Sequence, residues 1–541
     1  MAVTQHKSAP RLCRQGNTLQ LTARGKPLVM LAGELHNSSA SSLDYLCPLL
    51  DKLARCHLNT VLAPVSWELL EPVEGQFDFT LVDGMILAAR RRGLRLVPLW
   101  FGTMKNATSC YAPSWVRNNL RRFPRAESTP GVSSWTVSPF SEEALRCDCL
   151  AFAALMKRIR EVDAADQTVI LVQVENESGI LHSARDHSPA ATAAFSGNVP
   201  AALLERLADK SRSVRPELRL AWEGCGARLR GTWQETFGRD AEEIFMGWHV
   251  ARFVDAVAAA GRRAYDIPMY ANAWLVGGPG LPPGTYPSGG PVSKLLDVWQ
   301  LAAPHLDFIA PDIYLSSFRS ACADYATQGN VLFIPEAKKD PAAAANALYA
   351  LGRHQALGFS PFAIEDIEET HPLVETYRAL EGMLPLVATA RGTGRMTAFL
   401  QEADEESWTA ELGGYRFRCR TSAKLADLRV PGSALLLLTE EGDFVCIGRN
   451  LIFTFESLNG ALRTAEVLAL DTGSFVNGKW QAGRRLNGDE TGHGTGVILG
   501  QPLTVCRFRL FSYDKKGDAA CGQAGHEIGT RSRGGEKAHP A

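Results

Sequence analysis

The sequence has no excess charge of one sign and no long uninterrupted apolar run. Its 541 residues carry a formal net charge of −1, so the chain offers no electrostatic footprint for nucleic acid or an anionic membrane. No segment approaches the ~20 apolar residues of a membrane-spanning helix, and residues 1–20 lack the apolar stretch of a secretory signal. We therefore expect a cytosolic protein that binds neither nucleic acid nor membrane.

The cysteines form neither a disulfide framework nor a clear metal motif. Many of the twelve lie within apolar runs, which favours reduced core thiols. Cys147 and Cys149, with Cys110 upstream, are separated by one residue instead of the two to four residues usual between zinc-binding cysteines. We therefore favour no metal and no cofactor over a zinc site there.

Short apolar runs alternate with longer helical patterns over the first 390 residues. This alternation is typical of a parallel sheet covered by helices. Eight strands close a (β/α)8 barrel, also called a TIM barrel, so we predict this α/β fold. The eight runs are 28–36, 58–66, 94–102, 169–177, 267–275, 308–314, 331–337 and 359–366.

A ninth strand-like piece, LRLAWEG at 218–224, does not fit a barrel of eight strands. It lies in the long stretch between the fourth and fifth runs. We therefore assign it to an insertion on the active-site side of the barrel, where long loops shape substrate access.

From about residue 395 the pattern changes to short strand-like segments separated by turns, without helical periodicity. We expect a catalytic barrel with an N-terminal lead-in at 1–390 and a smaller all-β domain at 391–515. Residues 516–541 are Gly-rich and polar, which predicts a disordered tail.

Two of the predicted barrel strands end in glutamates. The run VILVQVENE delivers Glu175 and Glu177, and VLFIPEA delivers Glu336. The carboxyl ends of barrel strands surround the active site, and glycoside hydrolysis uses two carboxyl groups, one protonated and one ionised. Strands four and seven can place such a pair ~5 to 6 Å apart, the separation of a retaining mechanism. Strand alternation puts Glu175 and Glu177 on one side and Asn176 on the other, so geometry alone does not choose between the two glutamates.

The segment V-E-N-E-S-G at 174–179 resembles the V-E-N-E-Y-G signature of glycoside hydrolase family 35, the retaining β-galactosidases. The resemblance implies that Glu177 is the acid/base and that Asn176 contacts the sugar 2-hydroxyl. It leaves Glu175 a structural role, and it implies that Glu336 on strand seven is the nucleophile. No cofactor is implied.

A second segment, LNTVLAPVSWELLEPVEGQFDF at 58–79, is similar to the family-35 segment after strand two. Looser similarity to family 42 comes from GTWQETFG at 231–238 and from Tyr314, which resembles the tyrosine that hydrogen-bonds the nucleophile. The family-35 C-A-E-W motif is replaced by LWFGTMKNATS, and the aromatic residue after the nucleophile is replaced in PEAKKD. The sugar pocket is therefore expected to be built differently.

Further residues near strand ends are candidates for substrate binding. Glu34 and Glu68 either bind sugar hydroxyls or form plain ion pairs, and Lys105 is a partner for one of them. Trp274, Tyr270 and Tyr314 offer flat apolar faces for pyranose rings, although such residues often serve only packing.

The predicted function is release of terminal β-linked galactose by double displacement. Another retaining exo-β-glycosidase, such as a glucosidase or xylosidase, is the alternative within the same class. A non-catalytic carbohydrate-binding barrel is the alternative from another class. The sequence leaves a homo-oligomer open.

Overall fold

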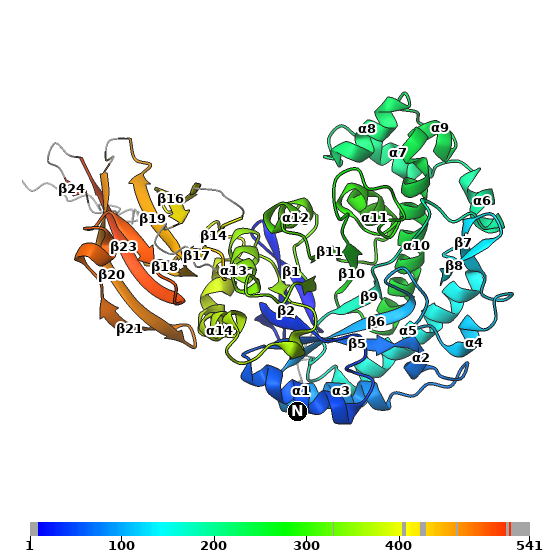
Figure 1. The fold of residues 1–541 in the computed structure, drawn as a ribbon, viewed down its shortest axis with the longest axis horizontal. Helices are drawn as coiled ribbons and strands as arrows, with labels where there is room; N and C mark the ends of the chain where they lie inside the picture. Colours follow the sequence, from blue (N-terminus) through cyan, green and yellow to red (C-terminus); the bar gives the residue numbers. More distant parts are fainter. Residues whose placement is uncertain are drawn as a thin grey trace, which may run out of the picture.

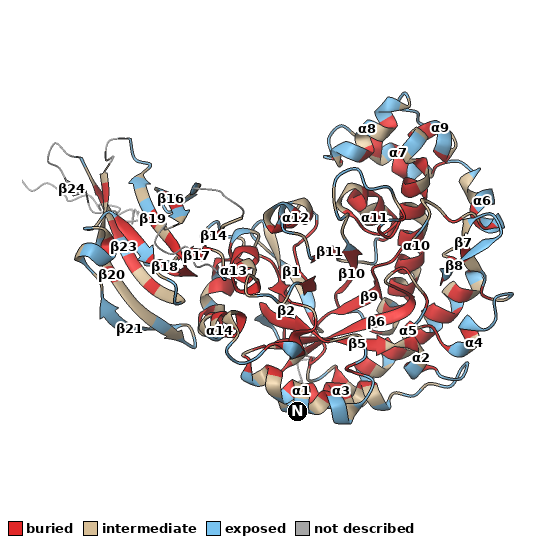
Figure 2. Ribbon diagram, viewed as in Figure 1, coloured by how far each residue is buried: buried red, intermediate tan, exposed pale blue. Residues whose placement is uncertain are grey.

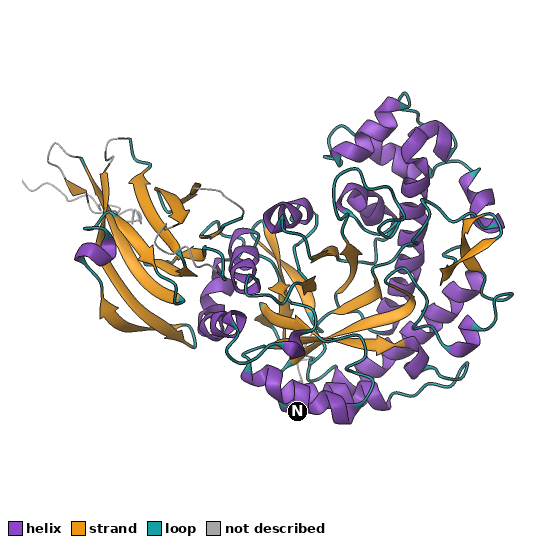
Figure 3. Cartoon of the chain, viewed as in Figure 1, coloured by secondary structure: helices purple, strands orange, loops and turns teal. Residues whose placement is uncertain are grey.

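The protein consists of an eight-stranded parallel barrel ringed by helices, followed by an all-β region (Figures 1 and 3). This arrangement confirms the predicted fold class. The computed structural model describes residues 9–514, apart from 328, 403–406, 422–428, 461 and 463, together with the backbone of 519–520. Among the described helices, none is both long and apolar enough to cross a membrane.

All eight predicted runs contain a barrel strand. Most of these strands are buried along their length (Figure 2), as expected for strands covered on both faces. Ile334 bridges Phe359 in parallel, and the Leu357 N–H donates to the Leu332 carbonyl at 2.7 Å, which closes the barrel between strands seven and eight. The strands are β4 (Met30–Glu34), β5 (Thr60–Ser66), β6 (Arg95–Lys105), β9 (Val172–Asn176), β10 (Met269–Trp274), β11 (Phe308–Ile313), β12 (Glu336–Ala337) and β13 (Gly358–Phe359).

One long helix follows each barrel strand and packs its apolar face on the sheet. The Ser141 hydroxyl caps the first turn of its helix by accepting from the Ala144 N–H, and Pro372 opens the last helix, where a missing N–H costs nothing. These helices are α1 (Leu43–Arg55), α3 (Thr80–Arg91), α5 (Glu142–Asp163), α10 (Ala241–Ala264), α11 (Leu296–Ala302), α12 (Phe318–Tyr325), α13 (Ala343–Arg353) and α14 (Pro372–Ala390).

An N-terminal sheet closes the amino end of the barrel. It comprises β1 (Arg11–Gln15), β2 (Thr18–Ala23) and β3 (Lys26–Pro27). Leu21 and Ala23 join the buried apolar cluster of barrel residues such as Leu99 and Phe101. The Arg24 N–H donates to the Gln167 side chain at 2.5 Å, just before strand β9. This end of the barrel is therefore sealed by packing.

The loops at the carboxyl ends of the strands carry the smaller elements. The piece 218–224 is helical, not strand-like as predicted, because Leu218 and Trp222, four residues apart, form one buried helical face. It lies in the insertion between β9 and β10. These elements are α2 (Trp67–Leu70), α4 (Ser114–Arg117), β7 (Arg125–Thr129), β8 (Val132–Val137), α6 (Pro189–Phe195), α7 (Ala201–Ala208), α8 (Pro216–Gly224), α9 (Trp233–Phe237), η1 (Gly238–Asp240), η2 (Ser293–Leu295) and η3 (Ile364–Asp366).

The C-terminal region packs two antiparallel sheets around phenylalanines such as Phe417, Phe444 and Phe508. In the described residues one sheet has the order β14-β17-β18-β23-β20-β21, with β24 beside β23, and the other has the order β15-β16-β19-β22. The strands are β14 (Met396–Leu400), β15 (Ser407–Leu412), β16 (Tyr415–Thr421), β17 (Ser433–Leu438), β18 (Phe444–Arg449), β19 (Leu451–Ser457), β20 (Thr464–Val476), β21 (Lys479–Arg485), β22 (Gly496–Leu499), β23 (Thr504–Tyr513) and β24 (Ala519–Ala520), with the short helix η5 (Gly488–Thr491).

The β region is anchored on helix α14. Arg449 pairs with Glu375 at 2.7 Å, and the Gly478 N–H donates to the Gly382 carbonyl at 2.9 Å. A Cβ at Gly382 would lie 2.0 Å from the Phe475 carbonyl, so only glycine permits this approach. We retain residue 390 as the proposed boundary between the two domains. The predicted tail at 516–541 lies outside the described residues, apart from the backbone of β24.

Candidate active site

Three carboxyl groups meet at the carboxyl ends of strands β9, β11 and β12. Glu177 directly follows β9, Glu336 opens β12, and Asp312 on β11 is the register partner of Glu336. One carboxylate oxygen from each of the three lies within 4.8 Å of the others. Glu177 and Glu336 are 159 residues apart in the chain, yet the barrel topology brings them together at the mouth.

The backbone at the end of β9 turns its two glutamates to different sides. Glu175 and Glu177 both adopt left-handed conformations, with φ of 59° and 44°. Such conformations are uncommon outside glycine and break the pleat of a strand. The expectation that both glutamates point to the same side is therefore wrong.

Glu175 points away from the mouth. Its carboxyl group accepts from the Met104 N–H at 2.5 Å and the Thr103 N–H at 3.3 Å. Burial raises its pKa well above the ordinary value, and the neighbouring Asp148 on α5 raises it further. Asp148 is in turn held by the Trp100 indole N–H at 2.8 Å. Glu175 thus belongs to a buried network that fixes β6 against β9.

Glu177 is buried and fixed by two asparagines. Its N–H donates to the Asn272 side chain at 2.9 Å, and its Oε2 accepts from the Asn106 amide. Burial raises the pKa of Glu177 to about 8, with a further contribution from the nearby charge of Glu336. Most of the Glu177 carboxyl is therefore protonated at pH 7.

Glu336 is surrounded by hydrogen-bond donors. The Tyr314 hydroxyl donates to its Oε2 at 2.8 Å, and the Asn176 and Asn272 amides each lie 3.4 Å from its Oε1. Lys105 donates to the Asn176 side-chain oxygen at 3.0 Å, which orients the Asn176 amide toward Glu336. These three donors hold the Glu336 carboxyl group in place, whereas the Glu177 carboxyl group accepts from the Asn106 amide.

A cavity of about 440 Å³ opens above these groups, within the range of small-molecule sites. Trp274 and Tyr314 lie on its wall and are 38% and 37% exposed, so their faces remain available to a ligand. The cavity is lined by Asn37, Lys105, Asn106, Glu177, Trp274, Leu275, Gly277, Asp312, Tyr314, Leu315, Glu336 and Phe362.

Glu34 and Tyr270, both predicted to bind substrate, are absent from this lining. Both are completely buried. Within the described part of the chain, neither Glu34 oxygen nor the Tyr270 hydroxyl has a hydrogen-bond partner. Burial raises the pKa of Glu34 well above its usual range, and the charge of Glu336 raises it further. Tyr270 instead stacks on Phe308, with ring centroids 5.3 Å apart.

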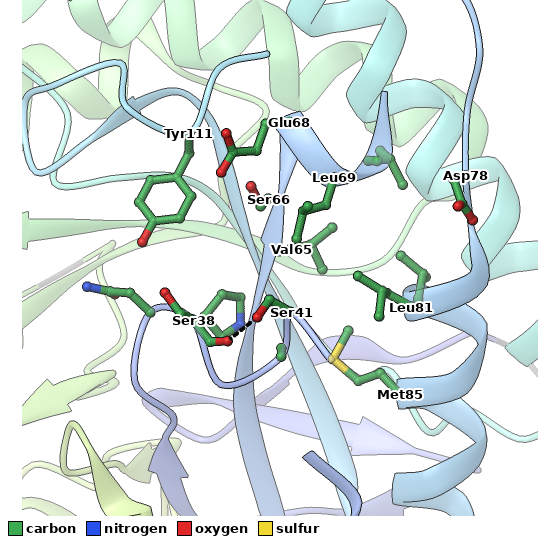
Figure 4. Close-up of a pocket in the computed structure, with 15 residues that line it drawn as sticks. Ser38, Ser41, Val65, Ser66, Glu68, Leu69, Asp78, Leu81, Met85 and Tyr111 are labelled. Carbon is green, nitrogen blue, oxygen red and sulfur yellow. Dashed lines mark hydrogen bonds between the residues drawn. The ribbon is translucent and has the colours of Figure 1, made fainter. Parts of the chain in front are cut away.

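Glu68, another predicted ligand for sugar hydroxyls, lines a separate small cavity of about 70 Å³ (Figure 4). This cavity lies between the loops after β4 and β5 and the first turns of α3. Glu68 lines it together with Tyr111, Leu69, Leu81 and Met85. Asn37 borders both cavities, so the small cavity adjoins the one that contains the glutamate pair.

Sequence reasoning missed Asp312, Asn272 and Asn106. Asn272 donates to Asp312 at 2.8 Å and so links strands five and six. Asp312 lies two residues before Tyr314 at the end of a predicted strand, so the strand-end rule that selected Glu336 applies equally to Asp312. Asn106 gives no comparable signal, because it reaches Glu177 from a turn beyond the end of β6.

Among the described residues, Glu177, Asp312 and Glu336 form the one group of three ligand-type side chains close enough to hold a metal ion. Their carboxylate oxygens suit a hard cation such as Mg²⁺ or Ca²⁺. However, Glu177 and Glu336 already accept hydrogen bonds from amide or phenol groups. The cysteine alternative has no such geometry: Cys147 contacts Arg122 and Arg146, and Cys110 is exposed.

Comparison with known families supports one of the two resemblances. Residues 49–211 match the glycoside hydrolase family 42 model, described as beta-galactosidase, and this segment includes Glu177. The family-42 similarity is therefore supported, whereas the closer resemblance to family 35 has no support. The match agrees with the predicted enzyme class, a glycoside hydrolase. Residues 373–498 match a domain of unknown function (DUF5597). No curated protein sequence matches the chain.

Several solved structures are similar in fold. The β-galactosidase from Rahnella sp. R3 has 15% identity and a TM-score of 0.46, over 67% of this chain and 57% of that one. The β-galactosidase from Marinomonas ef1 has 16% identity and a TM-score of 0.45, over 67% and 60%. The β-amylase catalytic domain from Paenibacillus polymyxa has 14% identity and a TM-score of 0.44, over 61% and 91%. The chain thus spans less than two thirds of either β-galactosidase.

Proposed function

We propose that this protein releases terminal β-linked galactose from β-galactosides with retention of anomeric configuration. One observation carries the proposal: Glu177 and Glu336 face each other with carboxylate oxygens within 4.8 Å. Retaining glycosidases place their two carboxyl groups ~5 to 5.5 Å apart, whereas inverting enzymes need ~6.5 to 9.5 Å to admit a water molecule. The spacing therefore supports direct attack by a carboxylate nucleophile over attack by a water molecule bound between the two carboxyl groups.

In the first step Glu336 attacks the anomeric carbon, and the bond from that carbon to the glycosidic oxygen breaks. Glu177 transfers its proton to the departing oxygen. The hydrogen bond from Tyr314 orients the attacking carboxylate. The raised pKa of Glu177 keeps its proton in place until the leaving oxygen gains charge.

In the second step a water molecule attacks the glycosyl ester on Glu336. Esterification has removed the charge of Glu336, which had raised the pKa of Glu177. Glu177 therefore ionises more readily and takes the proton of the incoming water. Hydrolysis frees the sugar with the anomeric configuration of the substrate and restores both carboxyl groups.

The residues around the pair are proposed to position the sugar ring. Asn176 lies beside Glu336, where the 2-hydroxyl of a sugar bonded to that carboxylate would be. Trp274 and Tyr314 offer exposed faces to the ring. Glu34 is completely buried, and burial and the charge of Glu336 raise its pKa well above the usual range, so we assign it a supporting role below the sugar. The choice of galactose rests on the family similarity.

A panel of aryl β-glycosides tests the proposal. We expect the 4-nitrophenyl β-galactoside to be the best substrate. If the glucoside or xyloside is hydrolysed faster, the proposed sugar changes from galactose to glucose or xylose and the proposed mechanism stays the same. No aryl release from any member, with retained sugar binding after Glu177→Gln and Glu336→Gln, would show a non-catalytic carbohydrate-binding barrel. Location in the cytosol and assembly into a homo-oligomer remain predictions.

A further inference from the structure

An exposed tryptophan lies on a hairpin that is hydrogen-bonded to the turn beside the proposed acid/base. Trp135 on β8 is 70% exposed, which makes it the most exposed large apolar side chain among the described residues. Tryptophan is usually well buried, because its large surface contributes strongly to packing. Its indole face stacks readily on flat ligands, and its N–H remains available for a hydrogen bond.

The β7–β8 hairpin that carries Trp135 belongs to the loop after barrel strand β6 and is bonded to the turn at 106–109. The Ser109 N–H donates to the Trp135 carbonyl at 3.1 Å, and the Val137 N–H donates to the Ser109 hydroxyl at 2.8 Å. The Thr136 hydroxyl donates to the Ala107 carbonyl. The backbone that carries the indole is therefore fixed relative to this turn.

The same turn holds Glu177. The Ala107 N–H donates to the Glu177 carbonyl at 3.1 Å, and the Asn106 amide donates to the Glu177 carboxyl group. The Trp135 ring meets the exposed His182 edge to face, with centroids 5.7 Å apart. His182 follows Glu177 by five residues in the loop after β9. Trp135 is thus tied to both segments that flank the acid/base.

We propose that Trp135 and His182 form a subsite for the leaving group, and that this group is itself a sugar ring. The inference rests on the proposed function, because it takes Glu177 as the acid. An acid that protonates the glycosidic oxygen lies on the side from which the leaving group departs. The indole face suits the C–H surface of a pyranose, and the imidazole offers polar contacts to its hydroxyls. The substrates are therefore β-galactosyl oligosaccharides.

A comparison of two substrates isolates this subsite. A β-linked galactosyl disaccharide has a leaving sugar, whereas β-galactosyl fluoride has none. For Trp135→Ala we expect the ratio of kcat/KM for the disaccharide to kcat/KM for the fluoride to fall about three- to tenfold, as the loss of one ring contact implies. Trp135→Phe should keep most of the ratio. Val132→Ala, a change at an exposed position of the same hairpin, should leave both constants unchanged.

An unchanged ratio in Trp135→Ala would overturn the inference, even with both substrates hydrolysed. Failure of the wild-type protein to hydrolyse the fluoride would instead contradict the proposed function. If Trp135→Ala fails to fold, His182→Ala replaces it in the same comparison. A fall in the ratio for His182→Ala supports the subsite, and an unchanged ratio overturns it.

Discussion

The two ends of the barrel are built on opposite principles. At the amino end the N-terminal sheet places Leu21 and Ala23 on a fully apolar cluster. At the mouth, Glu177, Asp312 and Glu336 are buried close together, and the pKa values of Glu177 and Asp312 are raised by burial. Burying carboxyl groups beside one another destabilises a fold. Such a group of buried carboxyls therefore indicates a functional site. The difference indicates that the amino end supplies stability and the mouth supplies chemistry.

Of the variants that separate the roles of the two ends, Glu177→Ala at the mouth should show the largest change, which is a loss of activity. Loss of a general acid slows hydrolysis about 10²- to 10⁴-fold. We expect a loss of that size in kcat/KM for a galactosyl disaccharide, and a smaller loss for a 4-nitrophenyl galactoside, whose leaving group needs little protonation. Thermal unfolding should be little affected. Equal losses for the two substrates would argue against the acid role.

Leu21→Ala at the amino end should lower stability and leave activity unchanged. Removing a fully buried leucine from the amino-end cluster should lower the free energy of unfolding by about 3 kcal/mol. The folded variant should retain its kcat/KM, because Leu21 lies on the N-terminal sheet at the end opposite the mouth. Denaturant unfolding measures the change, and Arg14→Ala at an exposed position of β1 is the control. A large loss of activity in the folded variant would contradict the assignment of stability to the amino end and chemistry to the mouth.

A smaller effect is expected from Tyr314→Phe. The change removes the 2.8 Å hydrogen bond to Glu336 and keeps the ring. A hydrogen bond to a charged group contributes about 1.5 to 3 kcal/mol, so we expect kcat to fall at least tenfold. Tyr45→Phe, at an exposed position, is the matched control. An unchanged kcat would show that Tyr314 does not support the nucleophile.

The smallest effect concerns pH. Glu177 must be protonated to act as the acid, and its raised pKa of about 8 keeps it so below that pH. The kcat/KM of the wild-type protein should therefore be halved near pH 8 and fall about tenfold for each further pH unit. Glu177→Gln should lack this alkaline limb with 4-nitrophenyl galactoside. If the alkaline fall in kcat/KM persists in Glu177→Gln, it reflects the ionisation of a group other than Glu177.

The sequence predicted the barrel because its eight strands form apolar runs between helical patterns. It failed at 218–224, where Leu218 and Trp222 fit either a strand or a helix, and packing in the insertion selected the helix. At the site, strand-end position selected Glu336 and the two glutamates Glu175 and Glu177, and the family resemblance singled out Glu177. The alternation of side chains along a strand predicted that Glu175 points to the same side as Glu177, and this prediction failed. The left-handed backbone at Glu175 depends on the tertiary contacts of β6 and β9.

Other site residues were beyond sequence reasoning for similar physical reasons. Asn106 reaches Glu177 through a turn, so its role depends on three-dimensional placement and not on any period. Tyr270 sits four residues before the exposed Trp274 on the same strand, but its ring lies one layer deeper in the barrel core. The depth of a side chain within the barrel is set by the tilt and register of the strands, which a single run of residues does not show.

The central claim is that Glu336 forms a covalent bond to the sugar. Incubation with 2-deoxy-2-fluoro-β-galactosyl fluoride, followed by proteolysis and peptide mass spectrometry, tests it most directly. The expected result is time-dependent inactivation with one fluorogalactosyl group on Glu336, which is lost slowly as activity returns. Labelling of Glu177 or Asp312 in place of Glu336, or turnover to the inverted sugar without any labelled peptide, would contradict the account.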